Sequence, residues 1–558
     1  MHETHRLEEY YFFERDWDSH DDLRESFEWN VPDQFNIAEY TCDRWAEDED
    51  RVALYAVDDT GQEEVYTFAD VRDDANRLAN YLADAGVSPG DRVGVYLPPK
   101  PETAITHLAA WKIGAATVPL SPLFGPDAVQ YRLSSCGVEA CILDGSVADA
   151  YQTATESIDV GTSLAVGDAD LPSFWDALDG QRSKFDTVST SPEDDALIMY
   201  TSGTTGPPKG VRHAHRLLLG HLPGIALTLL NMEVNEDDVA HSVAEWSWMG
   251  GLFVSLLSPW FYGIPVVSHD GGKFDPEETL ALIEEYDVTL FYGLSRVYDM
   301  MHAAVEADAH EVDSVRSIFN AGGKITGETA AWMREAFDAP VYNGFGQTES
   351  NMVLSESRLF ETDFESTTGE AFHPIVGKPA PGHTVELLDL DTSEPTVSTD
   401  ELGEIAVRYE GDPVCLKGYF GGEVRVADTL VDGWWLTGDV GTRDSSGRFV
   451  YAGRKDQVIN YSGYRIGPGE IETCLEHHAD VDECAVVGVA HDEKWEVPKA
   501  FVVASEAAAS DPDRTVDSLQ SHVRENLAKY KYPKEIELVS ELPKTTTGKI
   551  DRATLAED

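Results

Sequence analysis

The chain has 558 residues, 42% of them hydrophobic, and carries 102 acidic against 41 Lys and Arg side chains, a formal net charge of −61. This length exceeds one ordinary hydrophobic core, so we expect two or more globular domains. Acidic residues scattered along the chain argue against nucleic acid and anionic membranes as partners, because both are polyanions.

So large a negative charge repels itself in dilute buffer and is tolerated where abundant salt screens it. We therefore predict a halophile's cytoplasmic protein, such as one from a haloarchaeon; an acidic protein of an ordinary habitat is the alternative. The N-terminal residues are acidic and aromatic, and no apolar run approaches the length of a membrane span, so no membrane insertion is expected. Self-association into a homo-oligomer stays open.

The six cysteines show no C-x-x-C pair and no common zinc spacing. We expect reduced, mostly buried thiols and no metal-only site. They are Cys42, Cys136, Cys141, Cys415, Cys474 and Cys484.

From residue 92 onward, short β-rich runs alternate with helical runs, which predicts helix-covered, mainly parallel sheets in an α/β fold. The predicted strands are 92–97, 116–120, 140–144, 196–200, 265–269, 288–293, 317–323 and 340–346, with helices such as 276–285 and 327–337 between them. We assign these elements to a large N-terminal domain, residues 1–455.

Helices become rare after about residue 375. TVELLDL, GEIAVRY and a WWLTGDV/RFVYAG hairpin predict a β subdomain over about 375–455. A small α+β domain is predicted over 456–558, with helices near 471–477 and 516–529 and strands ECAVVGVA, KAFVVAS and EIELVS.

The stretch YTSGTTGPPKG, residues 200–210, has the chemistry to hold phosphate. Hydroxyls and flexible backbone amides can surround an anion, its glycines permit close approach, and Lys209 adds a positive charge. The spacing is not that of a Walker A loop, and a polar surface turn is the alternative. Two further strand-end loops, 321–323 and 344–346, would meet it at the carboxyl ends of the sheets and form one site.

Half of the 16 lysines lie in the last 108 residues. This end of the chain is expected to contact an anionic ligand, with a solvated basic face as the alternative. The eight are Lys455, Lys494, Lys499, Lys529, Lys531, Lys534, Lys544 and Lys549.

Five motifs follow one another in a fixed order: the phosphate loop, GFGQTES (344–350), WWLTGD (434–439), GRKDQVINYSGYRIGPGEIE (453–472) and PKTTTGKIDR (543–552). Together they resemble the AMP-forming acyl-CoA synthetases of the adenylate-forming superfamily. NYSGYRIGP and the segment KYPKEIELVSELPKTTTGKI are most similar to medium-chain acyl-CoA synthetases. The resemblance covers about residue 51 to the C-terminus and implies ATP, Mg²⁺ and coenzyme A as cofactors and a small carboxylic acid as substrate.

The resemblance assigns roles to individual residues. Attack of a carboxylate on the ATP α-phosphorus brings like charges together, so cations must neutralise the approach. Lys549 matches the lysine that bridges the acyl carboxylate and the α-phosphate, Glu349 the Mg²⁺ ligand, and Asp439 the acceptor of the ribose hydroxyls, beside Arg454. The implied catalytic set is Lys549, Glu349, Thr204 and Arg465.

The ATP and AMP contacts that the resemblance implies extend along these motifs. Phe345 stands where relatives usually have Tyr, and AGGKI (321–325) replaces a segment that often carries Gly-Glu. The implied contacts are Thr201, Ser202, Gly203, Thr204, Thr205, Gly206, Lys209, Gly322, Gly323, Lys324, Asn343, Gly344, Phe345, Gly346, Gln347, Thr348, Asp439, Arg454, Arg465 and Lys549.

A hinge is implied at Asp456, because one pocket serves two reactions and the small mobile domain must turn between them. The pantetheine path would follow Ser462, Gly463 and Tyr464, and the CoA nucleotide would contact Lys494, Arg524 and Tyr532. A surface-charge role is the alternative for these last three.

Trp248, Gly346 and Thr348 are expected at the acyl pocket. Gly346 stands where acetyl-specific relatives have a tryptophan, which leaves room for a longer or branched tail. Trp248 resembles a pocket wall, with a buried core tryptophan as the alternative.

We expect a ligase that activates a medium-chain or branched fatty acid through acyl-AMP and transfers it to CoA. Three alternatives stay open: an aryl acid such as benzoate as substrate, an adenylation enzyme that loads a carrier protein, and a nucleotide-binding regulatory protein without catalysis.

Overall fold

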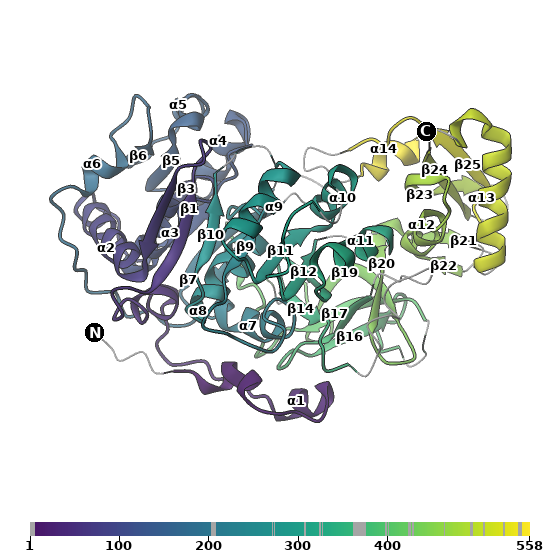
Figure 1. Cartoon of the computed structure of the whole chain (residues 1–558), viewed down its shortest axis with the longest axis horizontal. Coiled ribbons are helices and arrows are strands. Elements are labelled where there is room, and N and C mark those ends of the chain that lie inside the picture. Colours follow the sequence, from purple (N-terminus) through teal and green to yellow (C-terminus); the bar gives the residue numbers. More distant parts are fainter. Residues whose placement is uncertain are drawn as a thin grey trace.

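The computed structural model describes residues 6–201, 208–270, 272, 274–305, 309–322, 325, 327–360, 375–396, 399, 401–421, 426, 429–461, 464–491, 495–505, 508–527, 531–544 and 550–557. Within these residues the strands form three sheets. Two of them build a large body, and the third lies in a smaller lobe at the C-terminal end of the chain (Figure 1).

A seven-stranded sheet carries the strand that leads into the phosphate loop. Its inner strands are parallel, whereas β7, β8 and β18 pair antiparallel at one edge. In sheet order the strands are β18 (Gly418–Tyr419), β8 (Lys209–Ala214), β7 (Asp195–Thr201), β4 (Ala116–Pro119), β3 (Arg92–Tyr96), β5 (Ala140–Asp144) and β6 (Thr162–Val166).

A thirteen-stranded sheet joins a parallel half to an antiparallel half. The strands from β1 to β13 along the sheet are parallel, and the strands beyond β13 are antiparallel. Its order is β16 (Val385–Asp389), β17 (Gly403–Arg408), β19 (Trp434–Arg443), β20 (Phe449–Arg454), β15 (Ile375–Pro379), β14 (Asn351–Ser355), β13 (Val341–Gln347), β12 (Ser317–Ala321), β11 (Leu290–Leu294), β9 (Ala240–Ser242), β10 (Val266–His269), β1 (Val52–Val57) and β2 (Glu63–Thr67).

The small lobe contains a five-stranded sheet with α12, α13 and α14 around it (Figure 1). Its strands are β22 (Tyr464–Ile466), β21 (Ile459–Tyr461), β24 (Trp495–Ala504), β23 (Val481–His491) and β25 (Glu535–Val539). Its helices are α12 (Pro468–Glu476), α13 (Pro512–Asn526) and α14 (Arg552–Glu557).

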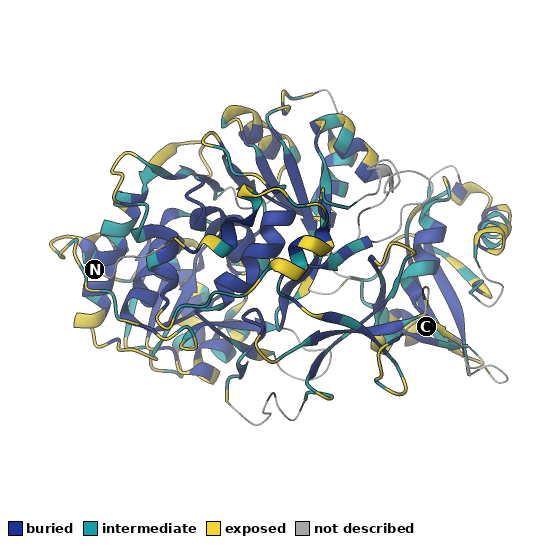
Figure 2. Ribbon diagram, turned by 90° about the horizontal axis from the view of Figure 1, so that it is seen from below, coloured by how far each residue is buried: buried dark blue, intermediate teal, exposed yellow. Residues whose placement is uncertain are grey.

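The helices of the large body surround its two sheets, and buried residues fill the space between them (Figure 2). The longer ones are α2 (Phe68–Asp84), α3 (Pro101–Ile113), α4 (Pro126–Cys136), α5 (Ala148–Thr155), α7 (Leu217–Leu227), α9 (Pro276–Glu285), α10 (Ser295–Ala304) and α11 (Gly327–Phe337). The shorter ones are α1 (His20–Ser26), α6 (Phe174–Leu178) and α8 (Ser258–Phe261).

Local sequence accounts for where helices begin and end. Thr67 and Asp70 form a reciprocal capping box at the start of α2, and Asp275 accepts two backbone N–H groups ahead of Pro276 at the start of α9. Helix α3 is buried along its whole length and ends at Gly114, whose φ of 84° favours glycine. Helix α3 therefore lies in the interior, where it packs against β3 and β4 of the seven-stranded sheet.

One lysine ties the two large sheets together. The Lys100 Nζ lies 2.5 Å from a carboxylate oxygen of Asp144, at the end of β5, and 3.0 Å from one of Asp270, after β10. Burial works against the charge of Lys100, yet the two carboxylates outweigh it and raise its pKa. The ends of β5 and β10, which belong to different sheets, are therefore held together by charge as well as by packing.

The predicted α/β class is confirmed, and helices 276–285 and 327–337 coincide with α9 and α11. The strands in the range of the expected β subdomain belong to the thirteen-stranded sheet, where β13, β14 and β15 connect them to its parallel half. The six cysteines are buried, as expected, and no two of them are joined by a disulfide. None of the helices in the described ranges combines the length and hydropathy that a bilayer crossing requires.

Candidate active site

The carboxylate of Asp439 is held by two side chains of the neighbouring strand. Asp439 lies in β19 directly opposite Arg454 of β20. The Arg454 Nη1 donates to Asp439 Oδ2 at 3.0 Å, and the Tyr451 hydroxyl donates to Oδ1 at 3.1 Å. Only 5% of Asp439 is exposed, and a carboxylate so buried needs such partners to remain charged. The hairpin therefore presents an anionic acceptor in a fixed direction.

Electrostatics keeps both partners in the donor state. Burial works against the charge of Arg454, but Asp439 outweighs it and raises the pKa of the guanidinium. Burial, together with Asp439, also raises the pKa of the Tyr451 hydroxyl. Tyr451 was missed in the sequence, because only the pairing of β19 with β20 brings it to Asp439.

Glu349 lies in the connection between β13 and β14, where the two large sheets approach each other. The hydroxyl of Tyr419, in β18, donates to Glu349 Oε1 at 3.3 Å, and the Lys209 Nζ lies 5.5 Å from the centre of the Tyr419 ring. Burial raises the pKa of Glu349, and the charges of Arg454 and Asp439 also act on it. Glu349 is therefore close enough to Asp439 and Arg454 to feel their charges, and a single site that includes all three stays a prediction.

The GFGQTES segment contacts the WWLTGD hairpin. The Gln347 Nε2 donates to the Thr437 carbonyl at 3.4 Å, and the Phe345 ring centre lies 6.1 Å from that of Tyr451. The Thr348 carbonyl accepts from Asn351 Nδ2 at 3.2 Å. Residues 345–348 therefore lie beside Asp439, whose carboxylate is predicted to accept the ribose hydroxyls.

Gly346 is required by the backbone as well as by any ligand. A Cβ at this position would lie 1.8 Å from the carbonyl oxygen of Asn351, at a register shift between Phe345 and Gly346. No side chain fits there without movement of the main chain, so the missing indole is not by itself a sign of an enlarged acyl pocket. The acyl role of Gly346 stays a prediction with this second cause beside it.

Asn343, at the start of the segment, is bound to a buried carboxyl group that sequence reasoning missed. Glu356 Oε2 accepts from the Asn343 backbone N–H at 2.8 Å and from its Nδ2 at 3.0 Å. Asn320, in β12, donates from Nδ2 to the Asn343 Oδ1 at 2.9 Å. Burial raises the pKa of Glu356 to about 7, against the effect of these hydrogen bonds and of Arg448. The side chain of Asn343 is therefore engaged within the protein.

Gly322 follows β12 and has a φ of 81°, a left-handed conformation that glycine adopts without strain. It lies two residues beyond Asn320, so the two predicted adenine segments begin from neighbouring, hydrogen-bonded strands. Gly344 lies in β13, where it pairs with Ser355 of β14.

Trp248 lies at the surface. Trp248 is 39% exposed, and its ring packs edge to face against the ring of Phe124, with the two ring centres 6.1 Å apart. A buried core tryptophan is thereby excluded, and a wall at the mouth of a pocket stays the prediction.

In the C-terminal lobe, Arg524 and Tyr532 lie together. The Arg524 Nη2 donates to the Tyr532 hydroxyl at 2.6 Å, and the Lys534 Nζ lies 4.9 Å from the centre of the same ring. Two of the predicted CoA contacts, Arg524 and Tyr532, thus form a basic cluster around an aromatic face together with Lys534, which was not predicted. Arg465 instead pairs with Asp391 of the large body at 2.7 Å, so its predicted phosphate contact stays a prediction.

The predicted hinge residue Asp456 is exposed and lies in a short 3₁₀ turn, Lys455–Gln457. The Lys455 Nζ lies 2.6 Å from Glu404 Oε2, and Glu404 Oε1 accepts from the Gly438 N–H at 3.0 Å. The chain is therefore anchored to the large body at Lys455, and the next strand, β21, belongs to the sheet of the small lobe. The hinge at Asp456 stays a prediction.

Several predicted residues lie outside the described ranges, among them Lys549. On either side of residues 545–549, Lys544 pairs with Ile550 and the Asp551 N–H donates to the Pro543 carbonyl at 2.8 Å. Also outside the described residues are Ser202, Gly203, Thr204, Thr205, Gly206, Gly323, Lys324, Ser462, Gly463 and Lys494. Thr201 ends β7 opposite Lys209, and Tyr464 pairs with Tyr461.

We predict that Tyr451→Phe raises the KM for ATP by up to about tenfold, because one hydrogen bond to a charged group is lost. The KM for CoA should not change. Tyr286→Phe is the matched control, since the Tyr286 hydroxyl also donates to a carboxylate, that of Glu63, but on the surface. Steady-state kinetics with each substrate varied in turn measures the effect; a normal KM for ATP in Tyr451→Phe would contradict the assignment.

Comparison with known proteins covers nearly the whole chain. The family model of the AMP-binding enzyme matches residues 42–420, and that of the AMP-binding enzyme C-terminal domain matches residues 470–549. The uncharacterized acyl–CoA ligase YtcI of Bacillus subtilis is 30% identical over 531 residues, 94% of this chain and 96% of that protein. The mitochondrial acyl-coenzyme A synthetase ACSM3 of Rattus norvegicus is 28% identical over 559 residues, 97% of this chain and 93% of that protein.

Among solved structures, the anthranilate CoA ligase AuaEII in complex with anthranoyl-AMP is similar with a TM-score of 0.82 at 26% identity. The match covers 94% of this chain and 98% of that one. The similarity in fold therefore extends over both the large body and the small lobe.

Proposed function

The chain belongs to the AMP-binding enzyme family, and from this premise we propose that it is an ATP-dependent acyl-CoA synthetase for a medium-chain or branched fatty acid. Its similarity to acyl-CoA ligases along almost its whole length makes it an AMP-forming acid–CoA ligase. A carboxylate oxygen attacks the ATP α-phosphorus and pyrophosphate leaves. The CoA thiolate then attacks the acyl carbon, and AMP leaves.

The observation that carries the proposal is the cluster around Asp439. A carboxylate held by Arg454 and Tyr451, and almost removed from solvent, is suited to accept both ribose hydroxyls. The contacts of Phe345 and Gln347 with the same hairpin support an adenine site beside it.

The residues present fit a magnesium ion. Mg²⁺ in nucleotide sites is bound through one or two carboxylates together with the phosphates, and Glu349 offers such a carboxylate next to the Asp439 cluster. Glu349 would hold the ion, which when bound screens the charge of the pyrophosphate leaving group. Tyr419 orients the Glu349 carboxylate through its hydroxyl.

We assign the neutralising cation of the first reaction to Lys549. Arg552, three residues further, pairs with Glu472 at 2.7 Å. The charge of Arg552 also acts on Tyr451, which supports an approach of this segment to the Asp439 cluster. The turn at Asp456 would let the lobe move between the two reactions, with residues 1–455 and 456–558 as the two bodies.

The choice of acid separates the proposal from its closest alternative. Similarity to acyl-coenzyme A synthetases favours a fatty acid, whereas the similarity in structure to an anthranilate CoA ligase favours an aryl acid. The exposed Trp248 and the half-buried Phe124 beside it are suited to contact an apolar tail.

A panel of acids from C2 to C12, with branched and aromatic acids, tests the substrate at high salt. We expect pyrophosphate release to be fastest with medium-chain or branched acids and to be accompanied by consumption of CoA. Highest activity with benzoate or anthranilate would replace the proposal by an aryl-CoA ligase. Formation of acyl-AMP without consumption of CoA would instead favour loading of a carrier protein.

Lys549→Ala tests the assignment of the cation. We expect adenylation to fall by at least about 100-fold, because a preorganised charge is removed from the transition state. Conversion of supplied acyl-AMP to acyl-CoA should continue, since no α-phosphate attack is needed. Lys184→Ala, at an exposed position, is the control. Equal loss of both half-reactions in Lys549→Ala would contradict the role.

A further inference from the structure

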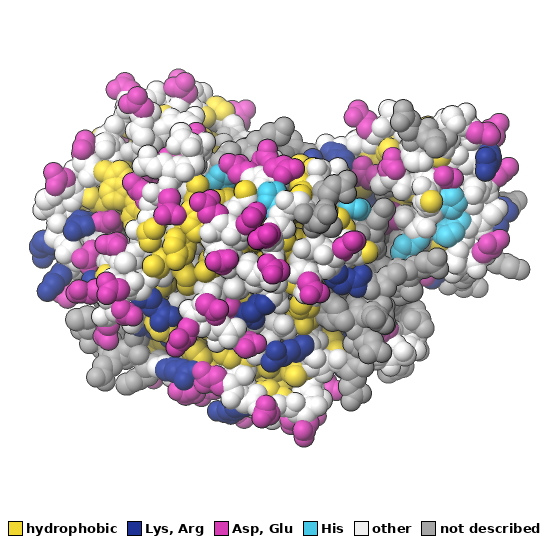
Figure 3. Space-filling model, viewed as in Figure 1, with side chains coloured by type: hydrophobic (Ala, Val, Ile, Leu, Met, Phe, Trp, Pro, Cys, Tyr) yellow, Lys and Arg dark blue, Asp and Glu magenta, His cyan; other side chains and the backbone are white. Residues whose placement is uncertain are grey.

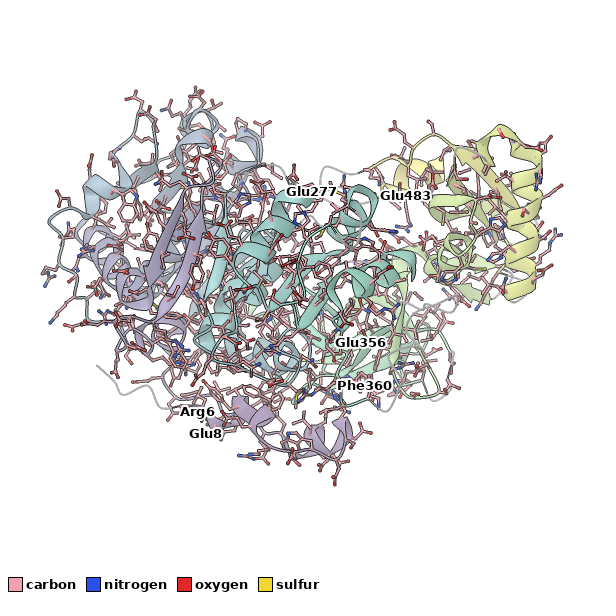
Figure 4. The ribbon with its side chains drawn as sticks, in the orientation of Figure 1. Arg6, Glu8, Glu277, Glu356, Phe360 and Glu483 are labelled. Carbon is pink, nitrogen blue, oxygen red and sulfur yellow. The ribbon has the colours of Figure 1, made fainter. Side chains whose placement is uncertain are left out.

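Glu356 is a buried carboxyl group that the proposed mechanism does not use. It is 7% exposed, follows β14, and lies inside the large body, away from the C-terminal lobe (Figure 4). A buried carboxyl group is costly unless the protein provides donors for it, so its partners indicate what it is for.

The partners of Glu356 converge on one residue. Its carboxylate accepts from both the backbone N–H and the side-chain amide of Asn343, and its own backbone N–H donates to the Asn343 carbonyl at 2.9 Å. Asn343 is thus held at its backbone N–H, at its backbone carbonyl and at its side chain. A residue held in this way has little freedom to rotate.

The hydrogen bonds continue from Asn343 to the second segment predicted to contact adenine. Asn343 accepts from Asn320, and Asn320 in turn accepts from the Ser295 hydroxyl, at the start of α10, at 3.1 Å. Asn320 precedes Gly322 by two residues, and Asn343 immediately precedes Gly344. One buried network therefore fixes the starting points of both segments.

We propose that Glu356 is a positioning residue for the adenine pocket: by fixing Asn343, and through it Asn320, it sets the separation of the segments 320–322 and 343–348. The inference rests on the proposed function, in which these segments contact the adenine base. It also changes the role of Asn343, whose side chain serves the network. The base is then contacted by the residues that follow Asn343.

Nucleotide binding measured without acid or CoA tests the proposal. Glu356→Met removes the acceptor at similar volume, and Glu356→Gln keeps an oxygen that can accept the Asn343 hydrogen bonds. We expect Glu356→Met to weaken ATP binding by about tenfold or more, and Glu356→Gln to restore most of it. Inorganic pyrophosphate, which has no base, should bind both variants as it binds the unchanged protein.

Glu102→Met is the matched control. Glu102, at the start of α3, is also a buried glutamate and is 8% exposed. Its carboxylate accepts a hydrogen bond from the Trp175 indole, in α6. Thermal unfolding of all three variants measures the structural cost, and we expect Glu102→Met to lose stability without a selective loss of ATP affinity.

Unchanged ATP affinity in Glu356→Met would overturn the proposal, and so would an equal loss of ATP and pyrophosphate binding or a failure of Glu356→Gln to restore ATP binding. Absence of turnover with every acid would overturn the proposed function instead, and the binding comparison would still decide the role of Glu356.

Discussion

The pairing of β19 with β20 is the constraint on which the candidate site depends. It places Asp439 opposite Arg454, brings the Tyr451 hydroxyl to the same carboxylate, and lets Phe345 and Gln347 pack against the hairpin. Strand β20 leads into Lys455, which pairs with Glu404, and then into the exposed turn at Asp456. The proposed nucleotide acceptor and the start of the small lobe are therefore both fixed by one hairpin, in which Arg454, the partner of Asp439, lies two residues before Asp456.

The charge of the chain makes its few cations informative. Acidic side chains are spread over the face shown in Figure 3, with few lysines and arginines among them. In the described part of the site, Arg454 and Lys209 stand against Asp439 and Glu349, so these four side chains have no net charge to offer a triphosphate. We therefore propose that positive charge for the phosphates comes from three other sources, the backbone amides of the predicted phosphate loop, a bound Mg²⁺ ion and Lys549.

Hydrophobic periodicity, together with the Pro and Gly residues that mark the ends of elements, was enough to predict most of the helices and strands. The β-rich runs became strands, and Pro276 and Gly327 correctly marked the first residues of α9 and α11. Resemblance supplied Asp439, Arg454 and Glu349. Tyr451, Tyr419 and Glu356 could not be found in this way, because their roles come from strand register and from contacts between residues distant in the sequence. Gly346 shows the opposite case, in which a motif position has a backbone cause that the sequence hides.

The most direct test of the account is the preference of the enzyme for ATP over 2′-deoxyATP. This preference is the ratio of kcat/KM for ATP to kcat/KM for 2′-deoxyATP, and it is measured in the unchanged protein and in Asp439→Ala. If Asp439 accepts the ribose hydroxyls, the unchanged protein prefers ATP by about tenfold or more, the value of a hydrogen bond to a charged group. The variant should then use both nucleotides equally poorly. A variant that keeps the full preference for ATP would show that the sugar is recognised elsewhere, and the site built around the β19–β20 hairpin would be wrong.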